Sequence, residues 1–235
     1  MVNLPNSFLN KHNLYYRKQR SLENTGRITS PGSQYVIQLL KGGYAGDQYR
    51  EGDGRKVLDV GCGSGFNCIS FAMMGWEVYG CEISEAIVEH AKKTIGNYGF
   101  DAEIRVGENE AIPFADGMFD FLLSVNVIHY VQSEAGIGKT VAEYARVLKP
   151  GGRILLLTNH PQNWLLEGCE SVDSNRVRVA LPGDYRDGEI LYLFHTRDEL
   201  CEKLSPYFCK IMLGENRLDF FSRKLRHWIL TAVKK

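Results

Sequence analysis

The chain has 235 residues, of which 44% are hydrophobic and 24% are charged, and this composition predicts one globular domain with elaborations. Its 28 basic and 28 acidic residues cancel, which disfavours a nucleic-acid partner, because phosphate binding normally shows a basic excess. No apolar run approaches the length of a membrane-spanning helix and the polar N-terminus lacks a signal-peptide core, so we expect a cytoplasmic protein without a membrane partner. The oligomeric state is left open.

The six cysteines form no C-x-x-C pair and no cluster with histidine at the spacing of a zinc site. We therefore expect no metal and a reduced protein. Cys62 lies inside a glycine-rich turn, where a small side chain is expected to pack rather than to act as a nucleophile.

Residues 1–50 precede the first predicted strand and contain one predicted helix. A serine and a proline at 30–31 suit its start, and glycines at 42–43 suit its end. Upstream, Tyr15 and Tyr16 lie in a basic and aromatic cluster. That cluster either closes over a ligand or packs on the domain as a solvated arm.

The most informative stretch is residues 57–65, VLDVGCGSG, an apolar strand that runs into three glycines at alternate positions. The aliphatic run suits a central strand buried on both faces. Gly61, Gly63 and Gly65 can adopt positive φ and allow a ligand to approach the backbone. A helix that begins near Phe66 would point its N-terminal amides at that ligand.

Two acids help to define the ligand. A dinucleotide fingerprint would need glycine where the chain has Phe66, and Asp59 would repel a pyrophosphate but attract an ammonium group. Glu82 follows the predicted strand 76–81 and suits hydrogen bonds to a ribose diol. The alternative for Glu82 is a solvated loop acid.

The next segments continue an alternation of strands and helices. A block at 107–120 leads into a predicted strand at 119–127, whose polar Ser124 and Asn126 lie near its carboxyl end, where open α/β sheets bind ligands. A helical apolar pattern over 137–148 is stopped by the Lys-Pro-Gly-Gly run at 149–152. A fifth strand is expected over 153–158.

The ordered set of motifs from 55 to 158 resembles the class I S-adenosylmethionine (SAM) dependent methyltransferases, and in particular the ubiquinone and menaquinone type of small-molecule methyltransferase. The resemblance implies a Rossmann-like, doubly wound α/β fold with a mostly parallel seven-stranded sheet. Its antiparallel C-terminal strand belongs to a pair expected at 207–216 and 227–234. The cofactor would be SAM and the product S-adenosylhomocysteine.

The resemblance also implies roles for individual residues. Glu108 stands where the family usually has Asp, which reaches the adenine amino group, and Asn109 would offer its backbone N–H to the ring. The residues expected to contact the cofactor are Asp59, Gly61, Cys62, Gly63, Gly65, Glu82, Ile83, Glu108, Asn109, Glu110, Asn126 and Val127.

The methyl acceptor is expected between two variable regions. Residues 1–50 form a predicted helical lid, and residues 51–235 form the SAM-binding domain with a substrate-pocket insertion at about 159–195. The candidate acceptor contacts are Tyr15, Tyr16, Tyr130, His160 and Trp164.

The predicted reaction is an in-line displacement that moves a methyl group to an oxygen, nitrogen or carbon nucleophile of a small molecule. His129 is the candidate general base, if the acceptor must lose a proton. The alternatives are methylation of protein or RNA, and a SAM-binding protein without catalysis. An NAD-dependent oxidoreductase is disfavoured by Phe66 together with Asp59.

Overall fold

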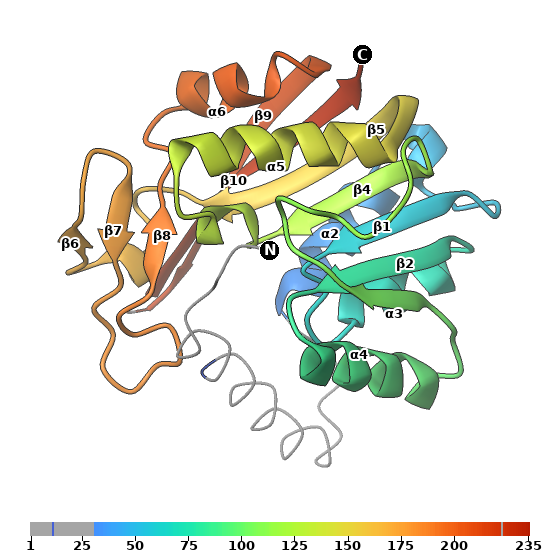
Figure 1. Ribbon diagram of the computed structural model, residues 1–235, viewed down its shortest axis with the longest axis horizontal. Helices are drawn as coiled ribbons and strands as arrows, with labels where there is room; N and C mark the ends of the chain where they lie inside the picture. The colour runs from blue at the N-terminus through green and yellow to red at the C-terminus, as the bar shows by residue number, and fades with distance from the viewer. Residues whose placement is uncertain (1–10, 12–30, 222) are drawn as a thin grey trace.

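The computed structural model describes Lys11, residues 31–221 and residues 223–235, and its centre is a seven-stranded sheet in the order β3-β2-β1-β4-β5-β10-β9 (Figure 1). The paired strands are parallel except at β10, which runs antiparallel to both β5 and β9. This arrangement confirms the predicted Rossmann-like sheet. The strands are β1 (Lys56–Val60), β2 (Glu77–Glu82), β3 (Glu103–Val106), β4 (Phe119–Val125), β5 (Leu148–Asn159), β9 (Phe208–Phe220) and β10 (Arg223–Lys234).

Helices cover both faces of the sheet, because successive side chains of a strand point to opposite faces. In β4, Phe121 and Leu123 pack in one core cluster and Leu122 packs in the other. The helices of the first cluster are α2 (Pro31–Lys41), α3 (Phe66–Met73) and α4 (Glu85–Asn97), and those of the second are α5 (Glu134–Val147) and α6 (Arg197–Leu204).

Residues 31–50 of the predicted lid segment are packed into the domain. Val36 and Leu40 of α2 are fully buried in the same cluster as Phe71 of α3, and Tyr49 of the short helix η1 (Asp47–Tyr49) joins them. Apart from Lys11, the earlier residues of that segment, with Tyr15 and Tyr16, lie outside the described residues.

Several boundaries differ from the predictions. β5 begins at Leu148 rather than at 153, because the Lys-Pro-Gly-Gly run at 149–152 already belongs to the strand. β4 ends at Val125 rather than at 127, because Asn126 has a left-handed backbone (φ 58°) and its N–H donates to the Leu157 carbonyl. The predicted final strands are longer and form one hairpin, at 208–220 and 223–234.

The insertion at about 159–195 holds a second sheet that the sequence does not predict (Figure 1). Its strands are β6 (Glu170–Ser171), β7 (Arg176–Arg178) and β8 (Ile190–Tyr192), in that spatial order. Each strand has only two or three residues, which is too short for an apolar alternation to be recognised in the sequence. The short helices η2 (Ile128–Tyr130) and η3 (Trp164–Leu166) lie on either side of this region, against β8 and β10 respectively.

Among the described residues, no helix combines the length and the apolar character needed to cross a lipid bilayer.

Candidate functional site

The glycine turn between β1 and α3 has the backbone that the sequence predicts. Gly61, Gly63 and Gly65 have φ values of 64°, 57° and 81°, which L side chains rarely adopt. A Cβ added at Gly61 would lie 2.5 Å from Cγ2 of Val127. The first glycine is therefore required by a close approach of the loop after β4 as well as by its dihedral angle.

Glu82, at the end of β2, is tied to this turn. Its Oε1 accepts from the Gly63 N–H at 2.8 Å and its Oε2 accepts from the Ile83 N–H at 2.9 Å. The residue is 8% exposed, and burial raises the pKa of its carboxyl. These contacts are those of a positioned group and not of a solvated loop acid; the ribose role stays a prediction.

Asp59 lies beneath the turn and is 1% exposed. Its Oδ2 accepts a hydrogen bond from the Cys68 thiol at 3.7 Å. Burial, with a smaller contribution from the nearby charge of Glu82, raises the pKa of Asp59 to about 8. A cationic ligand would favour the ionised carboxylate and bring this pKa down. The expected role of Asp59 toward an ammonium group stays a prediction.

The two loops that follow β3 and β4 meet beside the turn. The Gly107 N–H donates to the Glu82 carbonyl at 2.9 Å, and Glu108 forms a small bridge with Ala111. The Asn109 side chain donates to the Val127 carbonyl at 3.3 Å. The segment predicted to border the adenine and the predicted cofactor contact Val127 are therefore neighbours, as a single ligand across them would require.

Two other residues that are predicted to contact the cofactor lie in these loops. Asn126 is exposed, and Glu110 lies 3.8 Å from the ammonium of Lys139. Cys62 is buried, and its sulfur would lie 3.0 Å from a Cβ built on Gly80. Its thiol therefore packs against β2, as predicted, which leaves its backbone to form the turn.

His129, the candidate base, is 2% exposed within η2. Its Nδ1 lies 3.3 Å from the Thr158 hydroxyl and 3.4 Å from the Asn159 amide nitrogen. Burial, with the nearby His227 and Arg186, lowers the pKa of His129 to about 3. Such a histidine stays neutral and is a weak base, so this environment argues for a structural role.

The insertion gathers cations around Trp164. Arg186 pairs with Asp184 at 2.8 and 2.9 Å, and its guanidinium lies 5.1 Å from the Tyr185 ring and 5.6 Å from the Trp164 ring. Arg223 of β10 lies 4.3 Å from the same Trp164 ring. The sequence analysis did not identify either arginine, because a cation stacked on a distant aromatic leaves no spacing signal.

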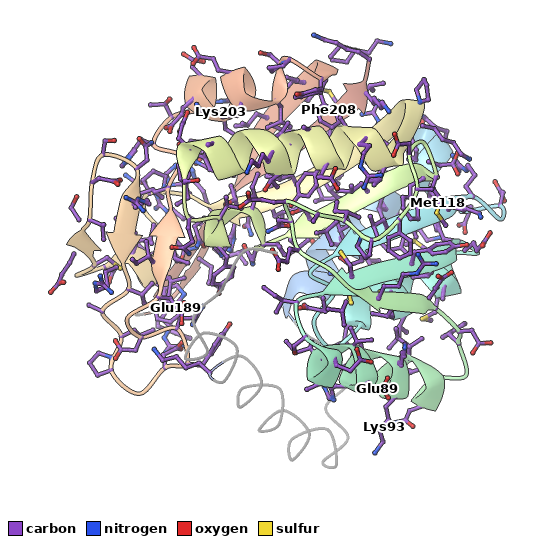
Figure 2. The ribbon with its side chains drawn as sticks, in the orientation of Figure 1. Glu89, Lys93, Met118, Glu189, Lys203 and Phe208 are labelled. Atoms are coloured by element: carbon purple, nitrogen blue, oxygen red, sulfur yellow. The ribbon has the colours of Figure 1, made fainter. Side chains whose placement is uncertain are left out.

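Tyr130 joins this group from η2. Burial, together with the charge of its hydrogen-bonding neighbour Tyr185, raises the pKa of Tyr130 well above its usual range. Figure 2 labels Glu189, which lies on the loop that enters β8. Its carboxylate is 3.9 Å from the ammonium of Lys11. Tyr130 and Trp164 are thus brought together through Tyr185 and Arg186. His160 lies farther along, where its ring centroid is 4.2 Å from that of Trp228.

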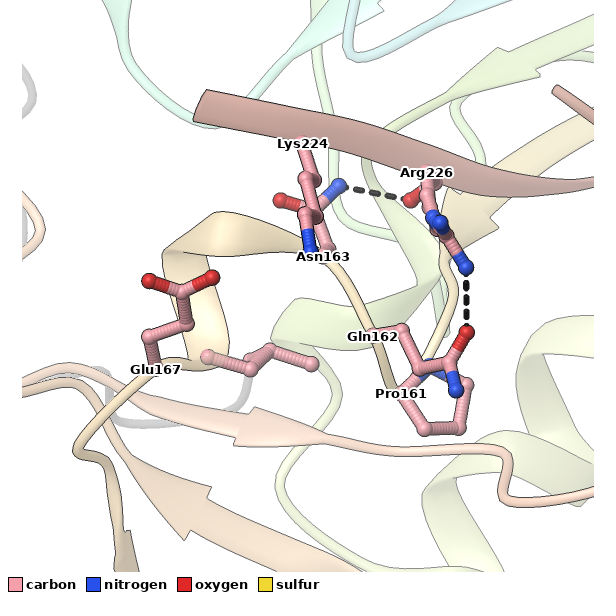
Figure 3. A pocket seen from close by; sticks show the side chains of 7 residues that line it. Pro161, Gln162, Asn163, Glu167, Lys224 and Arg226 are labelled. Carbon is pink, nitrogen blue, oxygen red and sulfur yellow. Dashed lines mark hydrogen bonds between the residues drawn. The ribbon is translucent and has the colours of Figure 1, made fainter. Parts of the chain in front are cut away.

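An open pocket of about 430 Å³ lies between the start of the insertion and β10 (Figure 3). Arg226 donates to the Gln162 side chain, and the Asn163 amide donates to the Arg226 carbonyl at 2.6 Å. The lining residues are Pro161, Gln162, Asn163, Leu166, Glu167, Lys224 and Arg226. A volume in this range suits a small molecule.

The strand order, the glycine turn after β1 and the acid that ends β2 define the class I methyltransferase fold. Residues 58–156 match the family described as the methyltransferase domain. This part of the chain is therefore similar in sequence to that family, and the sheet around it has the class I methyltransferase fold.

Two curated relatives and one solved structure illustrate the likeness. A ubiquinone biosynthesis O-methyltransferase of Brucella anthropi is 32% identical over 106 residues, which cover 45% of this chain and 42% of the relative. A malonyl-[acyl-carrier protein] O-methyltransferase of Erwinia pyrifoliae is 34% identical over 142 residues, which cover 60% of this chain and 52% of the relative. The chain therefore spans about half, or less, of the length of these relatives.

The 1,6-didemethyltoxoflavin-N1-methyltransferase of Burkholderia thailandensis, solved with 1,6-didemethyltoxoflavin and S-adenosylhomocysteine, has the same fold. It aligns with a TM-score of 0.67 and 16% identity over 100% of this chain and 92% of its own. The fold likeness thus extends beyond the matched domain and takes in the insertion and the final hairpin.

Proposed function

We propose that the protein transfers a methyl group from SAM to a small-molecule acceptor. The observation that carries this is the convergence of Asp59, the glycine turn, Glu82 and the loops after β3 and β4 at one edge of the sheet. The names of relatives that methylate ubiquinone precursors and a toxoflavin precursor support a small acceptor.

Each side of the cofactor would be held by a different group. The buried Asp59 carboxylate would face the ammonium of the amino-acid tail, and Glu82 would accept from the ribose diol. Glu108 and Asn109 would border the adenine. When bound, SAM supplies an electrophilic methyl group that needs no further activation from the protein.

The acceptor would enter from the insertion side. Tyr130, Trp164 and the pocket that includes Arg226 lie on the insertion and on the elements packed against it, so they can orient a nucleophile and exclude water from the methyl group. Oxygen, nitrogen and carbon acceptors all fit this arrangement. We assign no general base, because the environment of His129 keeps its imidazole neutral and weakly basic.

An acceptor carried on a protein is the second candidate. The relative named as a malonyl-[acyl-carrier protein] O-methyltransferase supports it, and the two cations of the pocket, Lys224 and Arg226, suit an anionic acceptor. A SAM-binding protein without catalysis would show cofactor binding but no transfer.

The test is transfer from methyl-labelled SAM into an extract of the source organism, with Asp59→Ala as the control protein. Products are separated into small molecules and precipitable macromolecules. Enzyme-dependent label among small molecules is the expected result. Label in protein moves the second candidate ahead. Calorimetric SAM binding without any transfer contradicts both and favours a non-catalytic role.

A further inference from the structure

We propose that Tyr144 is a positioning residue for the cofactor, because its hydroxyl fixes the loop after β3 against the loop after β4. This inference rests on the proposed function, since those loops are the ones expected to hold SAM. In the sequence, Tyr144 belongs to the apolar face of a helix and carries no functional signal. In the structure, its phenol hydroxyl forms hydrogen bonds with Asn109 and Ser124.

The ring of Tyr144 is anchored in the core. The residue is 1% exposed and packs in the same cluster as Leu122 of β4 and Leu148 of β5. Burial raises the pKa of the phenol, so the hydroxyl keeps its proton. Tyr144 therefore offers one hydrogen-bond donor, the phenol O–H, at a position that is fixed by the packing of its ring.

The direction of each hydrogen bond follows from the chemistry of the groups. The Tyr144 hydroxyl donates to Oδ1 of Asn109 at 2.9 Å, because an amide oxygen can only accept. Since that uses the single phenol proton, the Ser124 hydroxyl, 3.0 Å away, must donate to Tyr144. Nδ2 of Asn109 then donates to the Val127 carbonyl at 3.3 Å. The four groups form one directed chain from the core to the loop.

This chain ends on the groups expected to touch the cofactor. Asn109 adjoins Glu108, and Val127 packs so closely on Gly61 that a Cβ there would lie 2.5 Å away. The residue before Val127, Asn126, has a left-handed backbone that its surroundings must hold in place. Loss of the Tyr144 hydroxyl would release both loops at once.

The variant Tyr144→Phe removes the hydroxyl and keeps the ring. We expect SAM to bind roughly tenfold more weakly by calorimetry, as for loss of one buried hydrogen bond that orders the site. The KM for SAM should rise with it while kcat stays within about twofold, because the loop after β3 is expected to contact the adenine and not the methyl group. Hydrogen exchange should become faster at residues 107–111 and 126–130.

Tyr79→Phe is the matched control. Tyr79 lies in the same core cluster, is 6% exposed and bonds through its hydroxyl to Glu77, near the opposite end of β2 from the turn. This variant should lose stability to a similar degree, yet bind SAM as the wild type does.

A double variant tests whether Tyr144 acts through Asn109. In an Asn109→Ala background, Tyr144→Phe should weaken SAM binding by less than twofold. The inference is overturned if Tyr144→Phe alone binds SAM as the wild type does, or if Tyr79→Phe weakens binding equally. A wild-type protein that does not bind SAM overturns the proposed function itself, which separates the two failures.

Discussion

The proposed cofactor side and the proposed acceptor side of this molecule are built by different means. On the cofactor side, Asp59 and Glu82 are almost completely buried, and backbone amides hold Glu82 at two points. The proposed acceptor side includes the insertion, which carries short strands and partly exposed ion pairs, such as that of Arg186 with Asp184. The first region is pre-organised by the central sheet, whereas the second is a surface whose side chains can change without harm to the core.

The largest effect is expected from Gly61→Ala, which tests how rigid the cofactor side is. The added methyl group would clash with Val127, and the backbone at this position would hold the alanine in the left-handed region. We therefore expect a loss of about 2–4 kcal/mol in the free energy of unfolding and no measurable SAM binding. Chemical unfolding and calorimetry measure the two quantities.

The chain provides a control for that variant. Gly54 has φ of 74° with nothing within 4 Å of an added Cβ, so Gly54→Ala should lose about 1 kcal/mol from backbone strain alone. Adding Val127→Ala to Gly61→Ala should recover the part of the stability loss that comes from the contact with Val127. Equal losses at Gly61 and Gly54 would show that close approach is unimportant.

Asp59→Asn should weaken SAM binding at least tenfold while stabilising the fold at alkaline pH. The pKa of Asp59 lies at about 8 in the fold against an ordinary value of 3.8, so the wild type loses stability as pH rises from about 4 to about 8. Asparagine does not ionise, so the stability of the variant relative to wild type should increase from pH 5 to pH 8.

Calorimetry and urea unfolding at both pH values check this prediction. Asp120→Asn serves as the control, since Asp120 pairs with Lys149 at 2.8 Å and accepts from the Lys56 N–H at the far end of the sheet. It should lose stability without loss of SAM affinity. A relative stability of Asp59→Asn that does not change with pH would contradict the pKa shift.

On the acceptor side, Arg226→Gln should raise the KM for the acceptor about three- to tenfold and leave the affinity for SAM unchanged, because Arg226 lines the pocket and not the glycine turn. Arg178→Gln, at an exposed position of β7, is the matched control and should change neither constant. A parallel loss of SAM affinity at Arg226 would remove the distinction between the two sides.

The smallest effect is expected at His129. Because its pKa lies at about 3, His129→Gln should lower kcat less than tenfold and leave the pH profile between 6 and 9 unchanged, with the exposed His195→Gln as control. A drop of a hundredfold, with loss of a titration step, would restore His129 as the base.

The sequence predicted the central sheet because its strands, such as β1 with its last four residues buried, carry buried aliphatic runs. It extended β4 too far, since Val127 is apolar but follows the left-handed Asn126. The strands of the insertion, such as Arg176–Arg178, are too short for an alternation to be recognised. The contact of Tyr144 with Asn109 joins residues 35 apart, which periodicity along one helix cannot reveal.

The insertion also begins and ends against the same place. Asn159 pairs with His227 of β10, and the Phe194 carbonyl accepts from the indole N–H of the next residue, Trp228, at 3.0 Å. A segment whose two ends are anchored on adjacent residues of one strand can be exchanged for another segment while the anchoring strand is kept. Exchange of residues 160–193 therefore tests the proposed acceptor role of the insertion while the proposed SAM site stays unchanged.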